Sequence, residues 1–406
     1  MINSLSVPLA LLVSAIPTPK LCTQTSVTPV IRTLDTSDLV RGLPANPHLF
    51  RPRAATASHP QGHLLVVQNR VPVDVDSVES SQSPEAIGGS RDPVPSPNIP
   101  GQLHCPFGVQ FDSDGVMWVV EYDGGRVLKR NVDGSFTTVA GQSQAGYVDG
   151  AGSDAKFNQL HNLVIAPDGM IYLSEHMNHV IRSLDPKTGR VETLAGSGAP
   201  GFSGDGDNIR QPGATPVRFN QPISIALSPD GQSLLIADIG NRRIRELSLK
   251  TNSLRTVAGN GKQGVPIDGE LATDSPLVDP RAVAFDADGN FYIAERNGNA
   301  LRVVRDGRIY TLAGTGEKGK QDGPALQATF NGPKHIETGP DGRVYLADDN
   351  NHLIRIYDPQ TRTVSTLNTT PFELKRPHGV TWYRDSLYLS DSFHHRLIKI
   401  LAPMKN

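Results

Sequence analysis

The stretch PRAVAFDADGNFYIAER, residues 280–296, contains the pattern that decides the fold. It opens with a proline, continues as a short apolar run, turns at Asp288-Gly289 and ends in a second apolar run closed by Glu295. Glycine tolerates the left-handed backbone of a tight turn, and alternating apolar residues around an Asp-Gly pair are typical of a hairpin. The stretch therefore predicts two short antiparallel strands.

The same pattern occurs six times along the chain. The copies begin at Pro106, Leu160, Pro222, Pro280, Pro333 and Pro377, at spacings between 44 and 62 residues. Two further apolar runs follow each hairpin, as at 300–305 and 309–314, so that each unit has four short strands. Four strands at this period predict the blades of an all-β propeller, because one blade cannot cover both of its apolar faces alone.

These units resemble NHL repeats, a propeller family named for the triplet Asn351-His352-Leu353 that this chain carries literally. Looser versions of the triplet stand at 178–180, 241–243 and 394–396, and the resemblance covers about 106–402. It implies a closed ring but little about function, because the family includes scaffolds, receptor domains and enzymes. A His or Arg recurs at the position of His352, which favours a structural role. We expect it to pair with the acid that ends the preceding strand, which is Glu175, Asp238, Asp348 or Asp391.

The last repeat stops after three strands, at Ile400, so we expect a strand from the N-terminal part of the chain to cover its edge. The best match is VIRTL, residues 30–34, and residues from Pro52 onward then form a degenerate seventh blade. The alternative is six blades closed by HLLVVQ, residues 63–68. The repeat spacing slightly favours seven.

The resulting domain organisation has four parts. Residues 1–28 are a signal-like or disordered N-terminus, and 29–75 hold the closing strand and the possible degenerate blade. Residues 76–101 are a Ser-, Pro- and Gly-rich flexible loop, and 102–402 are the propeller.

The composition of the chain argues against several classes of function. The 39 basic and 41 acidic residues are well mixed, which argues against nucleic acid or a membrane surface as partner, and two cysteines make no disulfide scaffold. The apolar run at 5–16, followed by small residues, resembles an export signal without its basic start and is too short for a membrane span. We expect an extracytoplasmic or secreted monomer with no span in the mature chain. The alternative is a cytoplasmic protein with a disordered tail.

The mouth of the central channel is where a propeller is expected to carry its site, on loops held by a rigid ring. The residue after each repeat-opening position is the best sequence marker of that rim. These residues are Phe107, His161, Ile223, Arg281, Lys334 and His378, with Arg53 if the seventh blade exists; His104 and His335 lie one position away. Several cationic and proton-transferring groups at one mouth predict an anionic ligand such as a carboxylate.

Two metal sites are conceivable as well. The segments LHNL (160–163) and PHGV (377–380) resemble a motif of the propeller of peptidyl-hydroxyglycine amidating lyase, which binds zinc through three histidines from alternating blades. The resemblance implies zinc at His161, position 281 and His378, but Arg281 cannot ligate a metal, so His335 or His104 would have to replace it. Asp205 and Asp207 offer oxygens for calcium without a complete ligand set, and turn formation explains that loop equally well.

Two functions from different classes follow. The first is a module that binds a protein, a glycan or a small anionic ligand at the channel mouth or loop face. The alternative is a lyase or hydrolase in the funnel, with His161 and His378 as metal ligands or acid–base groups and with Arg281 and Lys334 orienting an anionic substrate.

Overall fold

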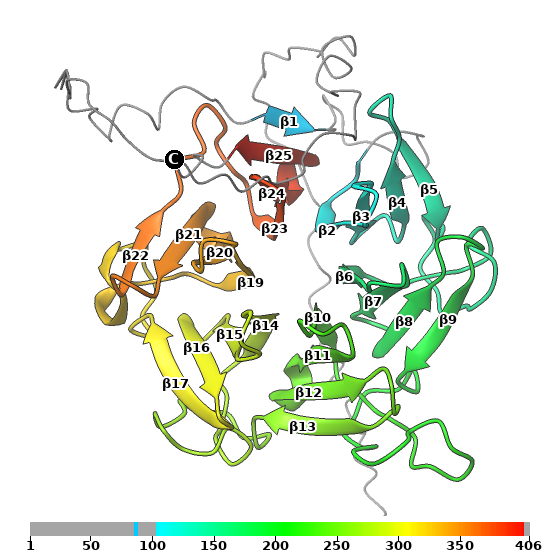
Figure 1. Cartoon of the computed structure of the whole chain (residues 1–406), viewed down its shortest axis with the longest axis horizontal. Coiled ribbons are helices and arrows are strands. Elements are labelled where there is room, and N and C mark those ends of the chain that lie inside the picture. The colour runs from blue at the N-terminus through cyan, green and yellow to red at the C-terminus, as the bar shows by residue number, and fades with distance from the viewer. Residues whose placement is uncertain (1–84, 88–102, 402–406) are drawn as a thin grey trace, which may run out of the picture.

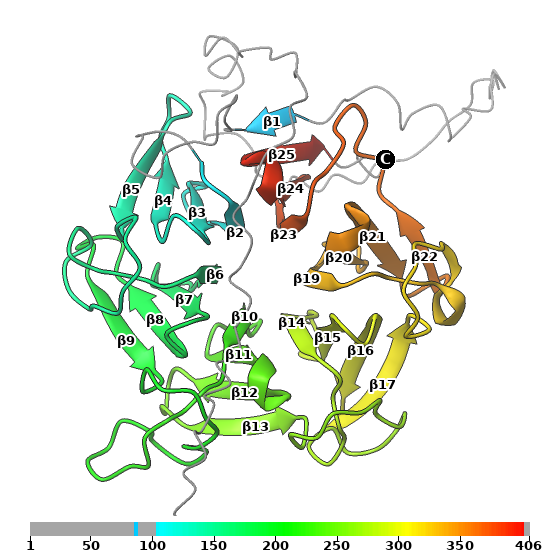
Figure 2. The ribbon, with the colours of Figure 1, turned by 180° about the vertical axis from the view of Figure 1, so that it is seen from behind.

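Six antiparallel sheets surround a common axis and form a closed ring, as the all-β prediction required (Figure 1; Figure 2 shows the opposite face). The computed structural model describes residues 85–87 and 103–401. The strand order in each sheet is a simple up-and-down sequence, with the first strand of each repeat at the centre of the ring and later strands outside it. Within the described ranges, no helical segment is long and apolar enough to serve as a membrane-spanning helix.

The six blades have the following strands. Blade 1 contains β2 (Pro106–Phe111), β3 (Met117–Glu121), β4 (Val127–Arg130) and β5 (Phe136–Ala140); blade 2 contains β6 (Leu160–Ile165), β7 (Ile171–Glu175), β8 (Val180–Leu184) and β9 (Val191–Ala195). Blade 3 contains β10 (Pro222–Leu227), β11 (Ser233–Asp238), β12 (Arg243–Ser248) and β13 (Leu254–Ala258); blade 4 contains β14 (Pro280–Phe285), β15 (Phe291–Glu295), β16 (Ala300–Arg305) and β17 (Arg308–Ala313). Blade 5 contains β19 (Pro333–Thr338), β20 (Val344–Asp348), β21 (Leu353–Asp358) and β22 (Thr363–Thr366), with β18 (Gly323–Pro324) at its edge; blade 6 contains β23 (Pro377–Tyr383), β24 (Ser386–Asp391), β25 (Arg396–Leu401) and β1 (Glu85–Ile87). Short 3-10 turns lie at Ile239–Asn241, Ala325–Gln327, Asp349–Asn351 and Ser392–His394.

The hydrophobic core lies between blades rather than inside any one of them. One cluster joins Trp118 and Val120 of blade 1 to Leu163 and Leu173 of blade 2 around Phe157 from the connecting loop. Because both faces of the second strand are covered in this way, β7, β15 and β20 are buried along their whole length. A single blade would expose two apolar faces to water, so the ring is the unit that folds.

The predicted closing strand exists, but in a different segment. The outer edge of β25 pairs with β1, with Ala86 opposite Ile398, inside the stretch that we expected to be a flexible loop. The two candidate segments, 30–34 and 63–68, lie outside the described residues. The prediction of the segment was wrong because a three-residue strand is too short to show the apolar alternation by which strands are recognised.

The slightly favoured seventh blade is also wrong. Blades 6 and 1 are direct neighbours: Thr381 Oγ1 and Ser390 Oγ donate hydrogen bonds of 2.7 Å to the carbonyls of Val109 and Phe107. Gly379 approaches so closely that an added Cβ would lie 2.1 Å from the Phe107 carbonyl oxygen. These contacts leave no room for another blade at the seam.

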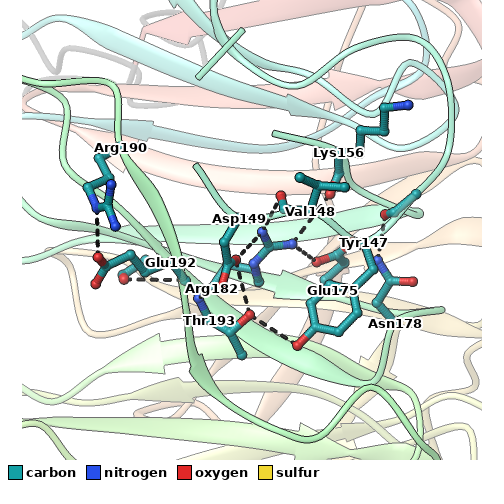
Figure 3. A network of polar contacts seen from close by, with 12 residues as sticks. Tyr147, Val148, Asp149, Lys156, Glu175, Asn178, Arg182, Arg190, Glu192 and Thr193 are labelled. Carbon is teal, nitrogen blue, oxygen red and sulfur yellow. Dashed lines mark hydrogen bonds and ion pairs between the residues drawn. The ribbon is translucent and has the colours of Figure 1, made fainter. Parts of the chain in front are cut away.

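A buried ion network recurs in the blades, and Figure 3 shows the one in blade 2. Arg182 of β8 is fully buried and donates to Glu175 Oε2 at 2.7 Å and to Asp149 Oδ1 at 2.5 Å. Glu175 also accepts the backbone N–H of Asn158 at 2.6 Å, in the loop that leads into the blade. Arg245 and Arg355 make the same pairs in blades 3 and 5, with Asp238 and Asp205 and with Asp348 and Asp322.

The network corrects the expected partner of His352. Asp348 accepts from Asn351 at 2.7 Å and Arg355 at 3.0 Å, whereas His352 Nδ1 accepts the backbone N–H of Arg376 at 3.2 Å, just before the next blade. The residue has left-handed backbone, with φ of 63°, which turns its ring away from the acid of its own blade. The contact of His352 is therefore structural, as expected, but it connects two neighbouring blades instead of two parts of its own blade.

Replacement of Arg182 tests the network. We expect Arg182→Met to lower the free energy of unfolding by about 3–5 kcal/mol, because Glu175 loses its buried cationic partner. The exposed pair Arg190–Glu192 in the same blade, at 2.7 Å, provides the control: Arg190→Met should cost less than about 1 kcal/mol. Denaturant unfolding of both variants measures the difference, and similar losses would contradict the assigned role.

Candidate functional site

The inner strands of all six blades surround a channel, and a side-chain contact between two opposite blades crosses it. Asn162 Nδ2 of blade 2 lies 3.3 Å from His335 Nε2 of blade 5, which stands opposite in the ring. Both side chains are buried. We call this contact the floor. A polar cluster lies on the side where the inner strands begin, and a cavity lies on the side where they end.

The polar cluster brings together five of the six predicted mouth residues. The ring of Phe107 stacks on His378 with centroids 3.8 Å apart and meets His161 edge-on at 5.0 Å. Arg281 NH2 lies 2.8 Å from His161 Nε2, and Lys334 Nζ lies 2.9 Å from His378 Nε2. The sixth residue, Ile223, is buried and adds only an apolar side chain.

The hydrogen bonds define the protonation of both histidines. A guanidinium group only donates, so His161 accepts at Nε2 and carries its proton on Nδ1. His378 places Nδ1 3.0 Å from the carbonyl oxygen of Arg376, so Nδ1–H donates there and Nε2 accepts from Lys334. Burial, reinforced by these neighbouring cations, lowers the pKa of both imidazoles well below its usual value. Both are neutral near pH 7.

This arrangement does not fit a three-histidine zinc site. Each Nε2 lone pair already faces a cation, and the third ligand position holds Arg281. His335 belongs to the floor, and His104 stacks on His395 at 5.3 Å at the seam of the ring. Among the described residues there is no group of three His, Cys, Asp or Glu side chains that could hold a metal ion.

The charges of the cluster are only partly matched. Lys334 contacts Asp349 at 2.9 Å, and Arg376 Nε donates to the same carboxylate at 2.8 Å. Burial lowers the pKa of Lys334 to about 7. Burial alone would raise the pKa of Asp349, but His378, Lys334 and Arg376 outweigh it and hold that pKa below the ordinary value.

Arg281 differs from the other buried arginines. Its side chain is buried, and burial lowers its pKa to about 10, so it stays charged at neutral pH. It makes no ion pair with a described carboxylate, and neither its Nε nor the Nδ1 of His161 has a partner among the described residues. The Nε–H group of a buried cation and the Nδ1–H group of a neighbouring imidazole are thus left without an acceptor among the described residues.

The sequence analysis missed a second set of mouth residues. Tyr122 stacks on Phe107 at 4.4 Å and donates to Gln159 at 2.7 Å, and His176 lies 6.5 Å from His161. Burial lowers the pKa of His176 to about 3. Tyr122, His176 and Asp349 each follow the acid that ends the second strand, so the repeat register contained a signal for them.

The remaining candidates lie elsewhere. Asp205 Oδ1 accepts a hydrogen bond from Arg245. Its Oδ2 accepts from the backbone N–H and the hydroxyl of Thr256, at 3.2 and 2.7 Å. Asp205 is therefore part of the blade 3 ion network. Asp207 is exposed. Arg53 lies outside the described residues.

Comparisons with known proteins agree with this architecture. No family model matches the chain. It is 28% identical over 244 residues to "Protein SUPPRESSOR OF QUENCHING 1, chloroplastic" from Arabidopsis thaliana, covering 57% of this chain and 23% of that protein. It is 25% identical over 352 residues to "NHL repeat-containing protein 2" from Gallus gallus, covering 66% of this chain and 48% of that protein. The chain thus spans less than half the length of either relative.

Solved structures show the same fold at low sequence identity. An auxiliary nutrient binding protein from Bacteroides thetaiotaomicron matches with a TM-score of 0.55 and 13% identity, covering 78% of this chain and 75% of that one. A virginiamycin B lyase from Staphylococcus aureus matches with a TM-score of 0.50 and 13% identity, covering 79% and 99%. The ring, its repeats and the named relatives lead to one conclusion. The chain is a six-bladed β-propeller built from NHL-type repeats.

Proposed function

We propose that this propeller is a binding module that holds a small anionic ligand at the channel mouth. The observation that carries the proposal is Arg281, a buried guanidinium whose Nε has no partner and which no described carboxylate neutralises. A buried charge is costly unless it is paired, and a bidentate carboxylate matches the donor fork of arginine. An anion on Arg281 would relieve that cost.

The surroundings of Arg281 support a ligand with a flat apolar body. His161, whose Nε2 accepts from the guanidinium, has a further unsatisfied donor in its Nδ1–H group. Phe107 and Tyr122 form a stacked aromatic pair against the same histidine, with Tyr122 6.0 Å from it. Of the three ligand classes expected from the sequence, a small carboxylate suits this combination best.

Export of the module is part of the proposal. The apolar run at residues 5–16 supports it. Recovery of the full chain in an extracytoplasmic fraction, with N-terminal sequencing, tests this point.

Acid–base catalysis is the alternative function, and the pair Lys334–His378 favours it. The ammonium group lies 2.9 Å from a neutral imidazole, and a lysine with a pKa of about 7 can exchange a proton at physiological pH. Bound zinc at one equivalent, lost in His378→Ala, or turnover of a carboxylate substrate that disappears in Lys334→Met, would favour a lyase or hydrolase.

Calorimetric titration with acetate, benzoate, citrate and inorganic phosphate tests the binding module. We expect at least one carboxylate to bind, and Arg281→Met to weaken it about 10- to 100-fold, since a hydrogen bond to a charged group contributes about 1.5–3 kcal/mol. Arg305→Met is the matched control, because Arg305 is an exposed arginine of the same blade. Failure of all four anions to bind, or equal losses in the two variants, would refute the proposal.

The pH dependence of that binding follows from Lys334. Its ammonium is mostly charged below pH 7 and mostly neutral above, while His161 and His378 stay neutral and Arg281 stays charged. Anion affinity should therefore fall as the pH rises from 6 to 8.5. Lys334→Met removes the charge, so this variant should bind the anion weakly at every pH. Lys334→Arg keeps the charge, so this variant should bind the anion tightly at every pH. A profile unchanged in both variants would show that Lys334 has no part in binding.

A further inference from the structure

The channel below the floor holds a cavity of about 670 Å³. Inner-strand residues of all six blades line it, and His335 and Asn162 of the floor form its inner end. The volume lies within the range of roughly 300–1,000 Å³ that is usual for small-molecule sites. None of the cationic side chains of the mouth cluster lines this cavity.

The cavity wall is polar and apolar in about equal measure, and its apolar part includes Val164, Val283, Ile336 and Trp382. Glu337 of β19 interrupts this surface with a carboxyl group. Its side chain is partly accessible from the cavity, and the surrounding protein disfavours its charged form. No described residue forms an ion pair with it. The backbone N–H of Trp382 is the group that favours its ionised form.

We propose that this cavity is a second ligand site, separate from the channel mouth, and that it binds a small primary amine with an apolar body through the carboxylate of Glu337. The carboxylate of Glu337, which has no ion-pair partner among the described residues, offers an ammonium group its counter-ion, and Trp382 and Tyr292 offer aromatic surface to the ligand body. The carboxylate of Glu337 would repel an anion. The cavity should therefore select cationic ligands, whereas Arg281 at the mouth should select anionic ones.

The other ionisable groups around the cavity do not provide the proposed counter-ion for an ammonium group in place of Glu337. On β19, burial lowers the pKa of His335 to about 4, so it is neutral. After β14, Asp286 accepts from Asn290 and from backbone N–H groups of its turn. On β15, burial raises the pKa of Tyr292 to about 12. After β23, Arg384 is exposed and lies over the ring of Tyr383 at 5.1 Å.

On β20, Tyr345 donates to Asp341 at 2.9 Å, and the pKa of Tyr345 is raised by burial and by this contact. Arg343, in the turn before β20, pairs with Asp358 at 3.0 Å. Glu337 is therefore the group whose ionisation should respond to a ligand in the cavity.

Proton release is the most direct test. Burial raises the pKa of Glu337 to about 8, so the carboxyl group is mostly protonated at pH 7. An ammonium ion binds the ionised form, so calorimetry with n-butylammonium chloride in buffers of different ionisation enthalpy should show release of about 0.9 proton at pH 7. Affinity should rise about tenfold between pH 7 and 9 and then level off. This measurement needs no variant.

Variants and a neutral probe locate the site. Glu337→Gln should weaken n-butylammonium at least tenfold and abolish the proton release, whereas Glu317→Gln, an exposed acid, should change neither. Arg281→Met should leave amine binding unchanged, so failure at the mouth and failure here are distinguishable. The proposal is overturned if n-butylammonium does not bind, if n-butanol binds equally well, or if Glu337→Gln retains the affinity.

Discussion

The carboxylate that ends the second strand of a blade is the group on which the rest of the structure depends. Asp348 accepts the backbone N–H of Asn331 at 2.7 Å, the side chain of Asn351 at 2.7 Å and Arg355 at 3.0 Å. It thereby fixes the loop that enters the blade, the 3-10 turn that leaves the second strand, and the third strand. Burying this acid is tolerable only because donors surround it. Since Asn331 lies just before Pro333 and Lys334, the same contact places the mouth residue of the blade.

The contrast between structural and unmatched arginines follows from that network. Arg182, Arg245 and Arg355 each reach one carboxylate of their own blade and one in the loop from the preceding blade. Two acids for one buried guanidinium more than balance its charge. Arg281 is buried to a similar degree, yet its contact is a neutral imidazole. Among the buried arginines that the structure describes, Arg281 is the one without a carboxylate partner, and this imbalance is the reason for proposing it as the ligand contact.

The sequence predicted the features that are encoded within each single repeat. Apolar alternation and Asp-Gly turns gave the strands, and repeat register brought Phe107, His161, Arg281, Lys334 and His378 to one mouth, where their contacts confirm the placement. Features that depend on the whole ring were missed. The strand β1 pairs with β25 over only three residues, too few to show a strand pattern in the sequence.

The floor could not be found from the sequence either. Asn162 and His335 face each other only because six blades place blades 2 and 5 on opposite sides of the axis. A seventh blade would leave no opposite partner. The residues that face each other inside the channel can therefore be identified only once the number of blades is known.

The floor gives the two ends of the channel separate chemistry. Lys334 and Glu337 lie three residues apart on β19, about 10 Å along a strand, and His335 stands between them. His335 contacts Asn162 across the axis, between the level of Lys334 and that of Glu337. Arg281 nevertheless acts through the floor, because after burial it is the charge that lowers the pKa of His335. The floor is therefore neutral mainly because His335 is buried, and the positive charge of Arg281 adds to that effect.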